Sequence, residues 1–268
     1  SIRRAKALAE DDLGYVDCGT SGGVWGLQEG YSLMVGGEAP VVEQIAPLLR
    51  TLAPAEDRGW ARVGPSGAGH FTKMVHNGIE YGMMQAYAEG FEILQKSRYD
   101  YDLRALSSLW NQGSVVRSWL LELAENAFEK DANLDSIRGY VEDSGEGRWT
   151  VLEAIEESVP ANAIAGSLFA RFASRQQVSP AMQAVAALRG QFGGHQVMTV
   201  AEGENLRLEA AKGVASPGTS EAQEEKKVVK PAGPNDAAKG DAAAAGPTSG
   251  TESTGGTPGP TSGTGSTG

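Results

Sequence analysis

The sequence predicts three successive parts: an α/β segment (residues 1–66), an all-α helical domain (residues 67–205) and a disordered tail (residues 206–268). Three observations support this division. Short alternating elements with glycine-rich turns fill the first part, and long helical patterns fill the second. Gly, Ser, Thr, Pro and Ala dominate the third. Without the tail roughly 210 residues remain, enough to bury a hydrophobic core.

The first part has the order of elements found at the end of an α/β sheet domain. A nucleotide-binding domain of that class normally opens with a strand and a G-x-G-x-x-G fingerprint, and neither opens this chain. We therefore expect a domain whose first half is missing. The predicted elements are a helix (1–10), a strand (13–19), a glycine-dense turn (20–30), a strand (31–37), a helix (40–53) and a short strand (60–63).

The second part contains only helical patterns. Its first helix is about 28 residues long, or roughly 42 Å at 1.5 Å per residue. Because that helix is apolar nearly all round, we expect it to be buried in a large domain or in a dimer interface. Pro160 and Pro180 stand at plausible first-turn positions of two later helices. The predicted helices lie within residues 67–97, 102–113, 114–131, 148–159, 160–177 and 179–192.

Composition excludes several classes of function. The chain has 23 Lys and Arg against 34 Asp and Glu, a net charge of −11, so general nucleic-acid binding is not expected. A single cysteine, Cys18, fits a reducing compartment. Because neither a secretory signal nor an apolar run of membrane-spanning length is present, we expect a cytoplasmic protein without a membrane segment. The three histidines and one cysteine do not cluster, so we expect no metal site.

One face of the long predicted helix carries an unusual set of polar residues: Lys73, His76, Asn77, Glu80 and Tyr81. Their helical spacing places them along one stripe. Such a stripe is compatible with a lysine that acts as a general base and a glutamate that acts as an acid. A polar seam facing solvent is the alternative interpretation, although such seams more often repeat Lys and Glu.

The turn DCGTSGG carries a weaker signal. Gly22 and Gly23 follow Ser21, and the N–H groups of a glycine-rich turn after a strand suit an anionic ligand. An ordinary loop between two strands explains the turn equally simply, and is preferred when the turn is taken alone.

Two further segments carry cationic residues. In RGQFGGH, Arg189 and His195 would suit a phosphate, but a helix C-terminus with a cationic last turn explains them as well. In GEGRWT, Arg148 and Thr150 stand at a predicted helix start, where capping is the alternative to ligand contact.

Taken together, four segments of this chain resemble 6-phosphogluconate dehydrogenase, the decarboxylating enzyme, in its short bacterial form. They follow one another in the order found in that family. The segment HFTKMVHNGIEY is the most specific of them. The wider β-hydroxyacid dehydrogenase group shares the SGG turn and the lysine. However, it usually has two asparagines in place of His76-Asn77, and it lacks the Glu80-Tyr81 pair. The four segments are residues 19–37, 67–94, 145–150 and 187–195.

The resemblance implies oxidative decarboxylation of 6-phosphogluconate to ribulose 5-phosphate in the pentose phosphate pathway, with NAD or NADP as hydride acceptor. It implies that Lys73 is the general base toward the C3 hydroxyl and then an acid during decarboxylation. Glu80 would protonate C1 of the enediol. His76 and Asn77 would hold sugar hydroxyls.

The remaining residues implied by the resemblance contact the substrate. They are Ser21, Gly22 and Gly23 beside the cofactor, Tyr81 and Arg148 at the phosphate, Thr150 nearby, and Arg189 and His195 reaching the neighbouring subunit's site. The last pair implies a homodimer. Arg175 stands at a different spacing from an arginine of the long family form, so it receives little weight.

The resemblance also has departures. The resemblance implies that residues 1–66 are the C-terminal part of a truncated Rossmann-type nucleotide-binding domain. No G-x-G-x-x-G fingerprint follows the strands predicted there. The choice between NAD and NADP is therefore open. Two alternatives also stay open: a β-hydroxyacid dehydrogenase acting on a smaller acid, and a truncated, inactive dimerising fragment.

Overall fold

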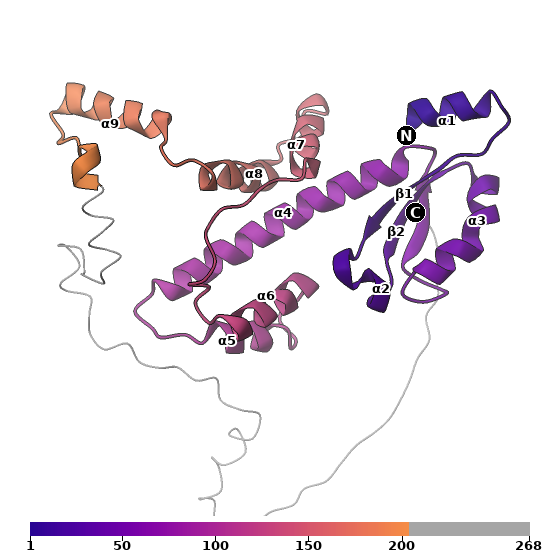
Figure 1. Ribbon diagram of the computed structural model, residues 1–268, viewed down its shortest axis with the longest axis horizontal. Coiled ribbons are helices and arrows are strands. Elements are labelled where there is room, and N and C mark those ends of the chain that lie inside the picture. Colours follow the sequence, from indigo (N-terminus) through magenta and orange to yellow (C-terminus); the bar gives the residue numbers. More distant parts are fainter. Residues whose placement is uncertain (204–268) are drawn as a thin grey trace, which may run out of the picture. The chain divides into compact units, whose positions relative to one another are not determined.

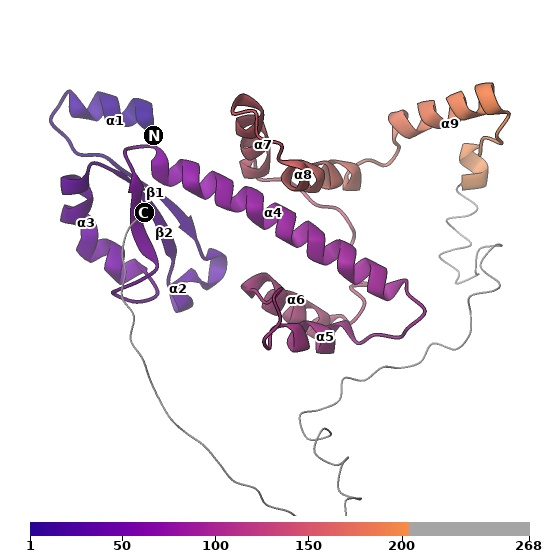
Figure 2. The ribbon, with the colours of Figure 1, turned by 180° about the vertical axis from the view of Figure 1, so that it is seen from behind.

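The computed structural model describes residues 1–203 (Figures 1 and 2). The predicted tail, residues 206–268, lies outside the described residues, as do residues 204–205 of the predicted helical domain. None of the helices within residues 1–203 combines the length and the hydropathy needed to cross a membrane.

Short elements fill the first part and helices fill the second, in the predicted order. The first part contains α1 (Ile2–Ala9), β1 (Val16–Ser21), the 3-10 turn η1 (Gly23–Trp25), α2 (Gly26–Glu29), β2 (Ser32–Gly37), α3 (Ala39–Leu52) and β3 (Trp60–Gly64). The second contains α4 (Ala68–Gln95), α5 (Leu103–Trp110), α6 (Trp119–Lys130), α7 (Glu146–Glu156), α8 (Asn162–Ser174) and α9 (Pro180–Gly193). The boundary after residue 66 stays a prediction, because α4 packs on both strands β1 and β2.

The three strands form one sheet in the order β1-β2-β3. Strand β1 pairs antiparallel with β2, and β2 pairs parallel with β3. A parallel pair requires a crossover connection, which α3 supplies. This helix buries Val42, Ala46 and Leu49, at helical spacing, and packs against a core that includes Val35.

Helix α4 has the predicted length of 28 residues. It begins after Gly67, whose φ of 103° favours glycine. There the buried carboxylate of Asp17 accepts hydrogen bonds from the N–H groups of Gly67 (2.5 Å) and His70 (2.8 Å). These bonds satisfy donors that a helix start leaves free, and they tie β1 to α4.

Glycines let the sheet approach α4 closely. A Cβ on Gly69 would lie 2.5 Å from the carbonyl oxygen of Met34, and a Cβ on Gly19 would lie 2.4 Å from the Cβ of Lys73. The end of β1, and with it the SGG turn, is therefore placed beside Lys73.

The far end of α4 belongs to a second core, formed with α5 and α6. Phe91 packs edge-on against Phe128, with ring centroids 4.9 Å apart, around the fully buried Leu121. Helix α6 begins at Trp119, later than the predicted residue 114. The reason is that the Ser118 hydroxyl caps it by accepting a hydrogen bond from the Leu121 N–H (3.1 Å).

Helices α7 and α8 pack on the middle of α4. The Thr150 hydroxyl lies 2.8 Å from the carbonyl oxygen of Met74 on α4, and Gly78 leaves the room that this threonine fills. Helix α7 begins at Glu146, two residues before the predicted start. Much of α4 is still uncovered within one chain, since Ile79 is 53% exposed and Ile93 is 71% exposed.

Candidate active site

The centre of the candidate site is a hydrogen-bonded group on α4. The amide oxygen of Asn77 accepts a hydrogen bond from the ammonium group of Lys73, one helical turn earlier. Nδ1 of His76 lies 3.0 Å from the same oxygen. Because an amide oxygen only accepts, the imidazole donates from Nδ1 in this contact. The structure thus brings together three residues of the predicted stripe.

Lys73 is half-buried, and none of the ion pairs among residues 1–203 involves it. Its partners are a neutral amide and the glycine-lined end of β1. A lysine held by an amide rather than by a carboxylate has its amino group available to a ligand.

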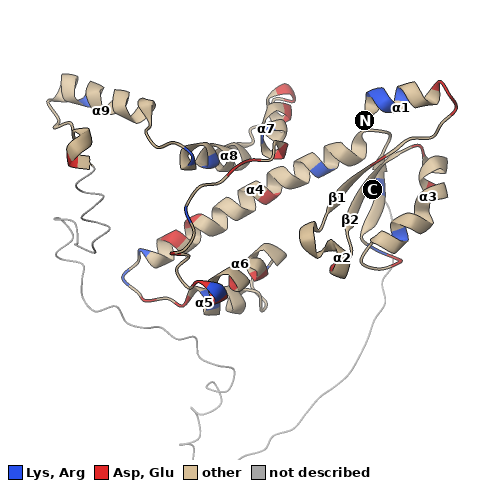
Figure 3. Ribbon diagram, in the orientation of Figure 1, with Lys and Arg blue, Asp and Glu red and all other residues tan. Residues whose placement is uncertain are grey.

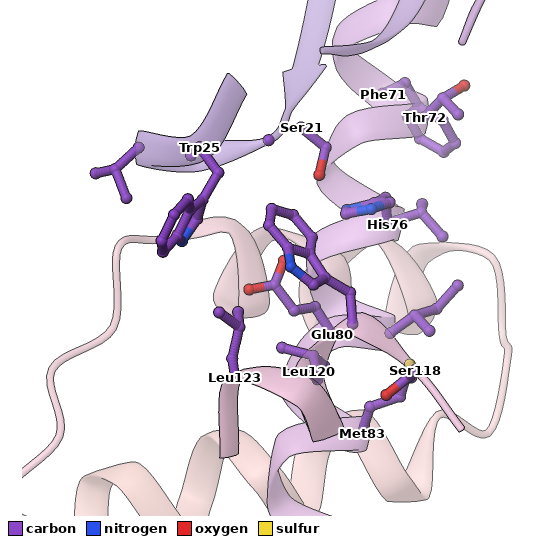
Figure 4. Close-up of a pocket in the computed structure, with 16 residues that line it drawn as sticks. Ser21, Trp25, Phe71, Thr72, His76, Glu80, Met83, Ser118, Leu120 and Leu123 are labelled. Atoms are coloured by element: carbon purple, nitrogen blue, oxygen red, sulfur yellow. The ribbon is translucent and has the colours of Figure 1, made fainter. Parts of the chain in front are cut away.

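A pocket of about 820 Å³ borders this group (Figure 4). His76 and Glu80 line it from α4, and Ser21, Gly22 and Gly23 line it from the turn after β1. Lys73 and Asn77 lie next to the pocket but do not line it. The remaining wall is mostly apolar: Val24, Trp25, Phe71, Thr72, Val75, Ile79, Met83, Ser118, Trp119, Leu120 and Leu123.

The SGG turn has the backbone that its glycines permit. Gly22 has a φ of 146° and Gly23 a φ of 52°, both in the region that favours glycine. A Cβ on Gly23 would meet no atom within 4 Å, so its backbone faces open space. Figure 4 shows the Ser21 side chain directed toward His76. The turn is therefore placed to contact a molecule bound beside α4.

Tyr81 and Arg148 lie in a second group, formed where α7 and α8 meet α4. Tyr81 is buried, and its hydroxyl accepts a hydrogen bond from the Ser144 N–H (3.2 Å). The guanidinium of Arg171 lies 3.5 Å from the centre of the tyrosine ring. We call Tyr81, Arg148, Arg171 and Arg175 the arginine cluster. Three cations and a phenol in one place suit an anionic group such as phosphate.

Asp143 organises the arginine cluster. Its carboxylate accepts hydrogen bonds from Arg148 (2.7 and 3.2 Å) and from Arg175 (2.9 Å). The hydrogen bond from Arg148 is the main reason why the pKa of Asp143 is lowered, and Asp143 in turn raises the pKa of Arg148.

The other predicted residues are less closely tied to the site. Thr150 is buried, and its hydroxyl lies 2.8 Å from the main-chain carbonyl oxygens of Met74 and Glu146. It lies inside α7, whose first turn is capped by no side chain, so the capping alternative is wrong for this residue. Arg189 on α9 and His195 after it are exposed, and neither lines the pocket beside α4.

Two features of the site were missed in the sequence. Arg171 is not among the predicted site residues, and its contact with Tyr81 joins residues 90 positions apart in the chain. Trp119 is not among the predicted site residues either, yet it lines the pocket with Trp25. No local pattern marks either residue.

Cys18 precedes the SGG turn but is not suited to nucleophilic chemistry. Burial raises the pKa of its thiol, with a smaller contribution from the neighbouring Asp17. A raised pKa reduces the thiolate fraction at neutral pH.

Two family models match parts of this chain. Residues 69–202, half of the chain, match the model of the 6-phosphogluconate dehydrogenase C-terminal domain. Residues 1–62 match the model of the NAD binding domain of 6-phosphogluconate dehydrogenase. The chain belongs to the 6-phosphogluconate dehydrogenase family. The predicted resemblance is therefore confirmed.

Individual relatives of this family match only in part. A Haloferax volcanii NAD(+)-dependent, decarboxylating 6-phosphogluconate dehydrogenase is 46% identical over 198 residues, which is 74% of this chain and 65% of that protein. A Bacillus subtilis enzyme of the same description is 41% identical over 182 residues, which is 64% of this chain and 39% of that protein. This chain thus spans less than two thirds of either relative.

A solved structure of Plasmodium falciparum 6-phosphogluconate dehydrogenase, determined in its apo form and in complex with NADP+ and with 6-phosphogluconate, has a TM-score of 0.58 and 30% identity. The match covers 74% of this chain and 43% of that chain.

The described residues fit only one end of a dinucleotide. Backbone groups at the open Gly23 and the indole of Trp25 border the pocket, where they suit the nicotinamide ring. A pyrophosphate is normally bound by a glycine fingerprint between a strand and a helix, and no such fingerprint follows the strands of residues 1–66.

Proposed function

We propose that this chain carries the substrate half of a 6-phosphogluconate dehydrogenase site. The proposed reaction is oxidative decarboxylation of 6-phosphogluconate to ribulose 5-phosphate and carbon dioxide, with NAD or NADP as hydride acceptor. The single observation that carries the proposal is that the arginine cluster contacts the helix of Lys73 through Tyr81, whose ring centre lies 3.5 Å from the guanidinium of Arg171. Tyr81 lies eight residues after Lys73, roughly 12 Å along the helix.

Lys73 is proposed as the general base. It would accept the proton of the substrate's C3 hydroxyl while the hydride leaves C3, and it would return a proton as the 3-keto acid loses carbon dioxide. The hydrogen bond to Asn77 supports this role, because it fixes the lysine side chain beside the SGG turn without an ion pair. The nicotinamide, when bound, supplies the hydride acceptor.

Glu80 is proposed as the acid that delivers a proton to C1 of the enediol. It lines the same pocket as His76, one turn earlier, so both would face one bound sugar chain (Figure 4). His76 and Asn77 would hold the sugar hydroxyls through an imidazole nitrogen and an amide.

The arginine cluster distinguishes 6-phosphogluconate from a smaller β-hydroxyacid. Arg148 and Arg175 already share the carboxylate of Asp143, and a small acid bound at Lys73 would bring no second anion to them or to Arg171. A phosphorylated sugar acid would place its phosphate there. Arg148 and Tyr81 are proposed as phosphate ligands, joined by Arg171, and Thr150 as a nearby contact that holds α7 against α4.

Arg189 and His195 are proposed to complete the site of a second copy of this chain. Their exposure is consistent with a role outside their own subunit. Helix α9 also presents exposed apolar side chains at helical spacing, which favours pairing with another copy. These residues are Met182, Val185, Leu188 and Phe192.

The proposed reaction is tested by mixing the purified chain with 6-phosphogluconate labelled with ¹³C at C1 and with NAD or NADP. The expected result is absorbance at about 340 nm together with equimolar labelled carbon dioxide. A reduced cofactor without labelled carbon dioxide would support a β-hydroxyacid dehydrogenase instead. Neither product, combined with no binding of 6-phosphogluconate, would support the inactive-fragment alternative.

A further inference from the structure

Asp143 holds Arg148 by one edge of the guanidinium. The Nε–H donates to Oδ1 (2.7 Å) and the Nη2 group donates to Oδ2 (3.2 Å), which is a bidentate pair. A guanidinium has a second edge, formed by Nη1 and the other N–H of Nη2. Among the hydrogen bonds of residues 1–203, none uses Nη1 of Arg148. The second edge is therefore available to an anion.

Burial and stacking fix this pair in place. The side chain of Asp143 is 4% exposed, whereas that of Arg148 is 50% exposed. The Arg148 guanidinium also lies 4.5 Å from the centre of the Phe172 ring, which restricts its plane. The carboxylate is thus covered while the arginine that it holds is open to solvent.

Asp143 also connects the arginine cluster across two helices. Arg175, 24% exposed at the end of α8, donates to Oδ2 of the same carboxylate (2.9 Å). The next residue, Ser144, donates its N–H to the Tyr81 hydroxyl (3.2 Å). One short segment before α7 therefore sets the positions of Arg148, Arg175 and Tyr81. Figure 3 shows the Lys and Arg positions on α8 and the Asp and Glu positions on α7.

We propose that Asp143 is a positioning residue for phosphate recognition: it orients the free edge of Arg148 toward the phosphate of the bound substrate. This proposal rests on the proposed function. The proposal places an acidic residue, Asp143, beside a binding site for an anion. Asp143 helps there by orienting Arg148, because an arginine already held by one edge loses less conformational freedom when its other edge binds.

The proposal predicts a change in anion affinity opposite to the one expected from net charge alone. Removal of a negative charge beside three arginines should strengthen anion binding if only net charge mattered. If Asp143 positions Arg148, the same change should weaken binding of a phosphorylated ligand and leave an unphosphorylated ligand unaffected.

The test compares Asp143→Asn with the wild-type chain by calorimetric titration with 6-phosphogluconate and with gluconate. We expect the Kd for 6-phosphogluconate to rise roughly tenfold or more, the Kd for gluconate to change less than about twofold, and Asp143→Glu to recover part of the loss. The matched control is Glu129→Gln, which removes the carboxylate of an exposed ion pair with Arg104 between α5 and α6. It should change neither Kd.

A second readout does not need the substrate. The Nε–H resonance of Arg148, assigned by its loss in Arg148→Lys, should be distinct in the wild-type ¹⁵N–¹H spectrum and merge with those of solvent-exposed arginines in Asp143→Asn. Unchanged or tighter binding of 6-phosphogluconate by Asp143→Asn would overturn the proposal, and so would an unchanged Arg148 resonance. If the wild-type chain binds no 6-phosphogluconate, the proposed function fails, and the resonance alone then decides whether Asp143 orients Arg148.

Discussion

Individual side chains in this protein derive their chemistry from their immediate partners. Lys73 donates to a neutral amide beside a glycine-lined strand end, whereas Arg148 is held by a covered carboxylate. The first arrangement suits a group that exchanges a proton, and the second suits a permanent charge that must point in one direction.

The first prediction concerns Lys73. Lys73→Met should reduce turnover of 6-phosphogluconate by roughly 100-fold or more, because a general base in the transition state contributes at least that much. The melting temperature should change little, since the methionine keeps the aliphatic stem. Enzyme kinetics and a thermal scan check both. Lys96→Met is the control, because Lys96 directly follows the same helix, its side chain is 76% exposed, and its ion pair within residues 1–203 is with Glu92. A large fall in stability with turnover retained would contradict the assignment.

The second prediction concerns the pH dependence of stability. The folded pKa of Asp143 lies below its unfolded value, so its stabilisation is present above the ordinary carboxylate pKa of about 3.9 and is lost as pH falls through the folded pKa. Wild type should therefore melt roughly 2–4 °C above Asp143→Asn at pH 7, and the gap should close below about pH 4. A gap that stays constant down to pH 2 would rule out this origin.

At the scale of elements, the junction of β1 and α4 determines which residues meet at the candidate site. The turn that contains Ser21 and the helix that contains Lys73 come from different parts of the chain. They meet because Gly19 and Gly69 lack side chains and because Asp17 caps the helix.

The third prediction compares two glycines of α4. Gly69→Ala should destabilise the chain by about 1–3 kcal/mol, because its Cβ would meet only main-chain atoms, the nearest at 2.5 Å. Gly90→Ala, where a Cβ would meet nothing within 4 Å, should instead stabilise by about 0.5–1 kcal/mol through helix propensity. Urea titrations measure both. Equal effects at the two positions would show that the close approach of sheet and helix is wrong.

Many of the helix lengths and boundaries could be predicted from the sequence. The 28-residue length of α4 followed from its uninterrupted pattern, and Pro160 and Pro180 marked the starts of α8 and α9 to within two residues. The start of α6 was not predictable from hydrophobic periodicity, since the Ser118 cap competes with the apolar residues that precede it. The arginine cluster was only half predicted, because Asp143 and Arg175 meet across 32 positions of sequence.

At the scale of the whole molecule, apolar surface remains uncovered on α4 and α9 within residues 1–203. Phe192 is 80% exposed and Leu188 is 63% exposed. Exposed apolar side chains at this density are typical of an interaction surface.

The fourth prediction follows from that surface. Light scattering coupled to gel filtration should give about twice the chain mass of 28.0 kDa. Leu188→Asp should shift the mass toward that of one chain, because a charge buried in an apolar interface is strongly unfavourable. Lys130→Asp, at the exposed end of α6, is the control and should leave the mass unchanged. A single-chain mass for wild type would contradict the proposed homodimer.

The central claim is that residues of α4, the SGG turn and the arginine cluster together hold a phosphorylated sugar acid. The most direct measurement is the melting temperature of the chain titrated with 6-phosphogluconate in the absence of any nicotinamide cofactor. A ligand at about 100 times its Kd stabilises the folded state by about 2.7 kcal/mol, so a rise of several degrees is predicted, with a much smaller rise for gluconate. A melting temperature that does not respond to 6-phosphogluconate at any concentration would contradict the claim.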